Sequence, residues 1–252
     1  MRVAYVDMVG GAAGDMLLAA FLDAGLDRAA LERALRSVVP DGWTLEPCRV
    51  VKRGIAATYA GLTVPGEDGD AAHHHHHHAG DDVDDARASR TLADVLAIVE
   101  CSGLSARQRD LASAVYRALA HAEARTRGTA AETMRFHEIG QIDAILDVAA
   151  TCVALDLLEI DELRCSPFPL GHAAERGSHP NLAPATAHLL AGWPTREVDV
   201  AGELVTPTAA AILTTLARPG EPALDVERIG YGAGRSDFPI PNVVRLSIGT
   251  PR

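Results

Sequence analysis

The chain has 252 residues, of which 48% are hydrophobic, and this is enough for one large domain or two small ones with a substantial core. Its 34 Asp and Glu residues outnumber its 23 Lys and Arg residues, and the resulting net charge of -11 attracts cations and argues against nucleic-acid or anionic-membrane partners. No apolar run reaches membrane-spanning length and Asp7 comes too early for a signal peptide, so we expect a cytoplasmic protein.

The first quarter of the chain predicts a strand, a glycine-rich turn and a helix in direct succession, followed by a second helix. Two β-rich runs then flank Arg53-Gly54, a dipeptide typical of a tight turn, and predict a hairpin. The expected ranges of these five elements are residues 2–7, 15–24, 27–37, 43–52 and 55–64.

Helical periodicity returns in the middle of the chain, with a break at Ser102-Gly103 and with Ser105 as the expected N-cap of the second half. Short strands and helices then alternate, separated by turns that contain proline. The expected helices span about 90–127, 138–158, 183–191 and 207–217, and the expected strands span 163–168, 197–200, 224–229 and 242–248.

This alternation predicts an α/β fold with a mixed sheet flanked by helices, and the early hairpin argues against an all-parallel sheet. Residues 66–88 differ from the rest because they are rich in Gly, Asp, Ala and His. Such a segment buries little apolar surface, so we expect a single domain that carries a disordered, acidic, His-rich loop.

The six consecutive histidines of this segment are its main chemical signal. Imidazole binds nickel, copper and zinc, and neighbouring carboxylates add hard ligands, so the run predicts metal binding with little selectivity. Two alternatives are a purification tag, although tags usually lie at a terminus, and a low-complexity loop without a role. The candidate ligands are His73, His74, His75, His76, His77 and His78.

A second candidate site is the segment FHEIGQIDAILD, residues 136–147. In a helix that begins near Glu138, Asp143 and Asp147 are four residues apart and share one face, with His137 at its start. Such a set suits a divalent cation or acid–base chemistry. The alternative is that these carboxylates offset the helix dipole.

Two segments predict anion binding at helix starts. The loop that contains Gly10, Gly11 and Gly14 and ends at Asp15 can hold a phosphate through backbone N–H groups, although it lacks the lysine of a Walker A loop. A tight turn that needs glycine is the alternative. Thr206-Pro207-Thr208 precedes a helix and suits either an anion or simple N-capping.

Two further histidines, His172 and His179, fall in a segment that contains Gly and Pro. Each is either a metal ligand or a solvated side chain, and the pattern does not separate the two possibilities.

Taken in order, these segments resemble the amino-terminal region of the nickel-insertion proteins that mature the lactate racemase cofactor. The resemblance runs from Val3 to about Ile248, and Met8 departs from it where a cysteine is expected. The segments that carry it, besides the His-rich loop, are VDMVGGAAGDM, FHEIGQIDAILD, SPFPLG, APATAHLLAG, GELVTPTAAAIL and GYGAGRSDFPIPNVVR.

The resemblance implies a nickel chelatase, a metal-inserting lyase that places Ni(II) in a pyridinium-3,5-bisthiocarboxylic acid mononucleotide in a CTP-dependent step. It also implies that CTP, with a divalent metal, is bound by a carboxy-terminal domain absent from residues 1–252, which a partner polypeptide would supply. A nickel-pincer apoenzyme is a further expected partner.

On this basis the candidate residues fall into three groups. The catalytic candidates are Asp15, His137, Glu138, Asp143 and Asp147; the cofactor-binding candidates are Gly10, Gly11, Gly14, Thr206 and Thr208; and the metal candidates are His73 to His78, His137, Asp143 and His179. Two rival hypotheses are a non-catalytic nickel store or metallochaperone and a metal-dependent enzyme that acts on another phosphorylated metabolite.

Overall fold

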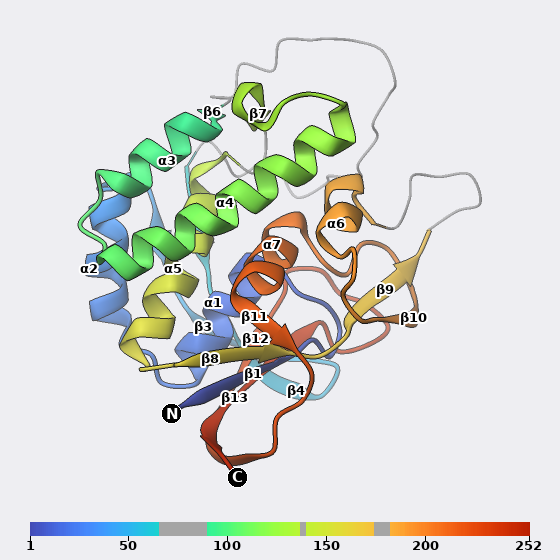
Figure 1. Cartoon of the computed structure of the whole chain (residues 1–252). Coiled ribbons are helices and arrows are strands. Elements are labelled where there is room, and N and C mark those ends of the chain that lie inside the picture. The colour runs from blue at the N-terminus through green and yellow to red at the C-terminus, as the bar shows by residue number, and fades with distance from the viewer. Residues whose placement is uncertain (66–89, 137–139, 174–181) are drawn as a thin grey trace.

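The computed structural model of the chain describes residues 1–65, 90–136, 140–173 and 182–252. Its centre is a seven-stranded mixed sheet with helices gathered on one side (Figure 1), which confirms the predicted fold class. The strand order is β11 (Ala217–Pro219), β8 (Glu162–Cys165), β1 (Val3–Asp7), β13 (Val243–Pro251), β12 (Leu224–Ala233), β4 (Ile55–Tyr59) and β3 (Cys48–Lys52).

Parallel and antiparallel pairs both occur in this sheet. The three strands β1, β8 and β11 run parallel, whereas β13 is antiparallel to both β1 and β12. The predicted hairpin is present as β3 and β4, with Arg53 and Gly54 both at positive φ, as a two-residue turn of this kind requires. It is prolonged by the short pair β2 (Thr44–Leu45) and β5 (Leu62–Thr63).

The helices form the second layer. They are α1 (Gly14–Asp23), α2 (Arg28–Val38), α3 (Leu92–Glu100), α4 (Ala106–Arg127), α5 (Ile142–Leu157), α6 (Pro184–Leu189) and α7 (Pro207–Leu216). A 3-10 turn (Ala131–Thr133) follows α4, and two strand pairs complete the described elements: β6 (Arg90–Thr91) with β7 (Arg135–Phe136), and β9 (Phe168–His172) with β10 (Thr195–Ala201). Ser105 caps α4 as predicted, and no helix in the described ranges is both long and apolar enough to cross a membrane.

The main core lies between these two layers. Alternate residues of β13, such as Leu246 and Ile248, are buried against the helices, whereas Arg245 points to the other face and pairs with Asp7 at 2.8 Å. The sheet therefore has one apolar face under the helices and one face that carries ion pairs.

Two glycines let α1 lie directly on β12. A Cβ atom at Gly230 would lie 2.2 Å from the Ala20 carbonyl oxygen, and one at Gly232 would lie 1.9 Å from the Met16 carbonyl oxygen. Met16 and Ala20 are one helical turn apart and the glycines are two strand positions apart, so the two contacts lie on matching faces. The expected strand ended at residue 229, but β12 continues to Ala233. The added part contains Gly230 and Gly232, the two glycines that make room for α1.

The start of α5 also differs from the prediction. The helix begins at Ile142 and not near Glu138, because Gln141 has extended backbone angles and the Gly140 carbonyl accepts a hydrogen bond from Arg90 Nη1 at 2.6 Å. The expected strand at 163–168 is divided as well, since the Ser166 hydroxyl accepts a hydrogen bond from the Met8 N–H and ends β8 at Cys165.

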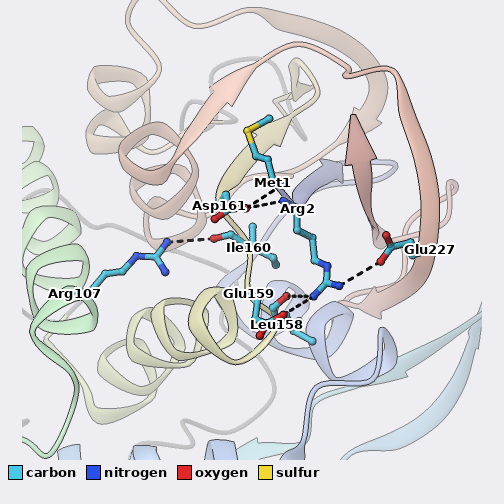
Figure 2. Close-up of polar contacts among 8 residues, drawn as sticks. All are labelled: Met1, Arg2, Arg107, Leu158, Glu159, Ile160, Asp161 and Glu227. Carbon is cyan, nitrogen blue, oxygen red and sulfur yellow. Dashed lines mark hydrogen bonds and ion pairs between the residues drawn. The ribbon is translucent and has the colours of Figure 1, made fainter. Parts of the chain in front are cut away.

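Arginine side chains tie the far end of α5 to its neighbours (Figure 2). Arg2 Nη1 donates to the Leu158 carbonyl at 3.1 Å, and Arg107 Nη2 donates to the Ile160 carbonyl at 3.2 Å. The Arg2 backbone N–H also donates to Asp161 at 2.7 Å. These cations satisfy carbonyl groups at a helix end where positive charge is favourable, and they fix α5 against β1.

This helix end contains a non-glycine residue at positive φ. Glu159 has a φ of 53°, and the Ile160 N–H donates to the Leu155 carbonyl at 2.8 Å, a pattern that normally places glycine at this position. We expect Glu159→Gly to raise the free energy of unfolding by about 0.5–1 kcal/mol, as measured by urea denaturation. Glu159→Ala is the control, since it removes the carboxylate but keeps the Cβ, and an equal gain in that variant would contradict the backbone explanation.

Candidate functional site

The starts of α1 and α7 lie side by side because the loop before α1 pairs with the chain before α7. Ala12 forms a parallel bridge with Val205, its N–H donates to the Leu204 carbonyl at 2.8 Å, and the Thr206 N–H donates to the Ala12 carbonyl at 3.0 Å. Two helix N-termini, each with a partial positive charge, therefore point toward the same region.

The start of α5 joins them through a close contact with α1. A Cβ atom at Gly14 would lie 2.3 Å from Asp147 Oδ2 and 2.7 Å from the Asp147 Cβ. Only glycine permits this approach, so Gly14 places the first turn of α1 directly on the Asp147 side chain. The neighbouring Asp15 and, one turn back on α5, Asp143 belong to the same cluster, which we call the carboxylate cluster.

The three members of the carboxylate cluster differ in environment. Asp15 and Asp147 are half-buried, whereas Asp143 is exposed and accepts a hydrogen bond from the Ala144 N–H at 2.6 Å. Asp147 Oδ1 is buried and has no hydrogen-bond partner among the residues that the structure describes. A buried carboxylate oxygen without a partner is costly, so this atom requires either a proton or a cation that binds later.

Burial and mutual repulsion raise the pKa values of the two half-buried carboxyl groups. Burial raises the pKa of Asp15 from 3.8 to about 6; the Met16 N–H and the Arg235 guanidinium act against this rise, and Asp143 adds to it. Burial, followed by the charges of Asp15 and Asp143, raises the pKa of Asp147 well above its usual range. A raised pKa means that Asp147 keeps its proton to a higher pH than an exposed carboxyl group does, and a bound cation would displace that proton.

Two residues near the carboxylate cluster were missed by the sequence analysis. Tyr116 of α4 is fully buried, and its pKa is raised well above 10 by burial and then by Asp147 and Asp143. Its position on a helix with many apolar residues is typical of a core residue, so periodicity gives no signal for it. Arg235 follows β12, and nothing in its local sequence indicates that its charge acts on Asp15.

The glycine-rich loop is held closely by its neighbours. The Gly10 N–H donates to the Val243 carbonyl at 3.2 Å, and a Cβ at Gly10 would lie 2.0 Å from the Pro241 carbonyl oxygen. Gly11 is equally crowded, because a Cβ there would lie 2.3 Å from the Leu204 carbonyl oxygen. Within the described residues, no acceptor is hydrogen-bonded to the N–H of Gly11, Ala13 or Gly14, so the described fold does not use these three donors.

The two candidate threonines occupy the start of α7. The Thr206 hydroxyl accepts a hydrogen bond from the Ala209 N–H at 3.3 Å, and Pro207 follows it in the first turn, which is the capping arrangement that the sequence left open. Thr208 is half-buried in the same turn. This helix start therefore lies beside the glycine-rich loop, with one hydroxyl already used as a cap.

Several metal candidates lie outside the described residues, namely His73 to His78, His137, Glu138 and His179. In the described part of the chain, no group of three His, Cys, Asp or Glu side chains is arranged to hold a metal ion. His172, at the end of β9, lies 3.4 Å from Asp199 and does not join the carboxylate cluster.

Two of the segments that the structure does not describe, 66–89 and 137–139, are flanked by residues that lie next to each other. Arg90, the first residue after the gap at 66–89, pairs with Phe136, the last residue before the gap at 137–139. Arg90 also binds Gly140, on the other side of the second gap and two residues before α5. The chain that leaves the His-rich segment therefore enters the fold beside the segment that leads to Asp143 and Asp147.

Comparison with known proteins gives one family over nearly the whole chain. A family model described as nickel insertion protein matches residues 4–252. Proteins named for nickel insertion from Thermomicrobium roseum and Myxococcus xanthus are 40% and 41% identical over 99% and 98% of the chain. The pyridinium-3,5-bisthiocarboxylic acid mononucleotide nickel insertion protein of Desulfitobacterium hafniense is 38% identical over 99% of it. The chain spans only 58–60% of the length of these relatives, and no solved structure matches it.

Proposed function

Because this chain belongs to the nickel insertion protein family, we propose that it inserts Ni(II) into a pyridinium-3,5-bisthiocarboxylic acid mononucleotide to form a nickel pincer cofactor. The observation that carries this proposal is the carboxylate cluster, where the buried Asp147 Oδ1 has no hydrogen-bond partner among the described residues. The described side chains do not by themselves form a set of three metal ligands, so His137 and Glu138 are proposed to complete the nickel site. The substrate is taken from the printed name of the Desulfitobacterium hafniense relative.

The chemistry of the donor set supports transfer rather than permanent storage. Carboxylate oxygens are hard ligands, whereas Ni(II) prefers nitrogen and sulfur, so a carboxylate site holds nickel less strongly than two thiocarboxylate sulfurs would. Because the pKa values of Asp15 and Asp147 are raised, nickel competes with protons for these carboxylates, and any proton still bound is released as the metal enters. As nickel leaves, the cluster takes protons back, which lowers the cost of losing the cation.

The other candidate residues have complementary proposed roles. In this proposal His73 to His78 collect nickel, and His137, Glu138 and His179 assist its passage to Asp143 and Asp147. For the first two segments the support is that the described residues flanking them, Arg90 and Phe136, pair with each other and that Arg90 binds Gly140 just before α5. The free N–H groups of Gly11 and Gly14, together with the first turn of α7, face an anion such as the phosphate of the mononucleotide.

The proposed reaction also involves CTP and two other proteins. We propose that insertion depends on CTP, that CTP with a divalent metal is bound by a carboxy-terminal-domain polypeptide outside residues 1–252, and that the product passes to a nickel-pincer apoenzyme such as a lactate racemase. The second candidate function is a nickel store or metallochaperone, which the run of six histidines favours.

Nickel binding by equilibrium dialysis separates the two functions. We expect a variant that lacks residues 72–79 to keep one nickel site, and we expect Asp15→Asn/Asp143→Asn to lose that site while the His-rich segment still binds nickel. The control is Asp110→Asn, an exposed change of the same kind on α4. If all nickel binding disappears with residues 72–79, the storage function is correct and the carboxylate cluster does not receive the metal.

A further inference from the structure

The loop after β12, residues 234–242, is anchored to the β3–β4 hairpin by charged side chains. Lys52 is only 14% exposed, and its Nζ donates to the Arg235 carbonyl at 3.1 Å, the Ser236 carbonyl at 3.4 Å and Asp237 Oδ1 at 2.7 Å. Arg53 Nε donates to the Phe238 carbonyl at 2.9 Å. A nearly buried ammonium group whose three protons all have acceptors gives this loop a defined position.

Hydrogen bonds within the same loop join its two ends, and both ends contact residues around the start of α1. Asn242 is buried, and its Nδ2 donates to the Ser236 carbonyl at 2.9 Å while its own carbonyl accepts from the Gly234 N–H at 3.0 Å. A Cβ at Gly234 would lie 2.9 Å from the Met16 Sδ, and one at Gly10 would touch the Pro241 carbonyl. The loop therefore lies between the hairpin and the glycine-rich loop.

Arg235 is the residue that this anchoring places beside the carboxylate cluster. Its side chain is exposed, its Nε lies 3.4 Å from the Tyr59 hydroxyl, and its charge lowers the pKa of Asp15. A second arginine near the cluster, Arg90, is directed to the Gly140 carbonyl at 2.6 Å. An acidic site in a chain of net charge -11 repels a phosphorylated ligand, so an anchored cation is required to admit one.

We propose that Arg235 binds the phosphate of the pyridinium mononucleotide, and that Lys52 and Asn242 are positioning residues that hold its loop. This inference rests on the proposed function, which it extends by assigning the group that recognises the anionic end of the substrate. Nickel then approaches the carboxylates of the cluster, while the phosphate lies toward the Arg235 side and the N–H groups of the glycine-rich loop that the described fold does not use.

Binding of two commercially available pyridinium compounds to the intact chain tests the role of Arg235. The probes are nicotinic acid mononucleotide and nicotinic acid riboside, which differ only in the phosphate, and affinity is measured by calorimetry. We expect Arg235→Ala to weaken mononucleotide binding roughly 10- to 100-fold and to leave riboside binding unchanged. Arg33→Ala, an exposed change of equal charge on α2, should have little effect on either probe.

Several outcomes would overturn this assignment. They are equal losses for Arg235→Ala and Arg33→Ala, equal losses for both probes, and a wild-type chain that does not prefer the mononucleotide. Nickel dialysis on the same proteins separates this failure from failure of the proposed function, because Arg235→Ala should retain the nickel site that Asp15→Asn/Asp143→Asn loses.

The positioning role of Lys52 has a separate signature. Lys52→Met should weaken mononucleotide binding about tenfold without affecting riboside binding, whereas Lys52→Arg, which keeps the donors, should restore most of the affinity. If Lys52→Met lowers thermal stability but leaves the preference for the mononucleotide intact, Lys52 supports the fold alone and the positioning claim is wrong.

Discussion

Replacing Asp147 with asparagine should stabilise the folded chain at pH 8 and, in the same variant, impair nickel transfer. The wild-type carboxyl group is held where no described residue hydrogen-bonds to its Oδ1 and where Asp15 and Asp143 repel its charge. The neutral amide removes that repulsion, so we expect a gain of about 1–2 kcal/mol in the free energy of unfolding and a rise of roughly 2–8 °C in Tm. Loss of the carboxylate should lower nickel affinity on the order of 10- to 100-fold.

The gain should depend on pH in a defined direction. Asp15 and Asp147 have folded-state pKa values above those of the unfolded chain, so the folded state binds more protons from about pH 4 upward. Wild-type stability therefore falls as the pH rises from about 4 through about 6, the pKa of Asp15, and over the range in which Asp147, whose pKa is also raised, loses its proton.

Thermal denaturation between pH 4 and 8 measures this dependence. Asp147→Asn should give a flatter curve than wild type and should gain little at pH 4, where the wild-type group is already neutral. Asp110→Asn is the matched control on an exposed surface and should change neither the slope nor nickel binding. A variant that is less stable than wild type at pH 8 would show that the carboxylate is already satisfied.

The opposed effects on stability and function explain why such a group persists in the fold. A carboxyl group with a raised pKa can exchange its proton for a divalent cation, but it costs stability whenever it ionises without one. The same region also contains the glycine contacts and the hydroxyl cap that bring three helix starts together. The cluster is thus a part of the described fold where ionisable groups lower the local stability.

Local chemistry explains which elements were predictable from the sequence. The hairpin turn at Arg53-Gly54, the cap at Ser105 and the threonine–proline start of α7 each depend on residues close together in the chain. The first strand and helix were predicted for the same reason, since an apolar run followed by glycines and then by helical periodicity is a local pattern.

Long-range contacts explain what the sequence did not reveal. The start of α5 depends on Arg90, which binds Gly140 from fifty positions away, and the length of β12 depends on glycines that contact α1. Tyr116 and Arg235 gain their electrostatic roles only when α4, α5 and the loop after β12 are assembled around Asp15 and Asp147. Spacing alone placed Asp143 and Asp147 together, but it gave no indication that Gly14 would lie against Asp147.

Gly14→Ala should therefore be among the most damaging single changes in the chain. The new methyl group would lie 2.3 Å from Asp147 Oδ2 and 2.7 Å from its Cγ, so α1 or α5 must shift. We expect a loss of about 1–3 kcal/mol in the free energy of unfolding, although alanine is normally the better residue in a helix. Nickel affinity should fall with it, because the shift separates Asp15 from Asp147.

A double-mutant cycle with Asp147→Ala shows whether that contact is the cause. In the Asp147→Ala background the side chain that Gly14 faces is largely gone, so Gly14→Ala should be nearly neutral or slightly stabilising in urea denaturation. The coupling energy should then be about equal to the loss caused by Gly14→Ala in the wild-type chain. If Gly14→Ala costs the same in both backgrounds, glycine is needed for the loop backbone itself, and the approach of α1 to Asp147 does not define the site.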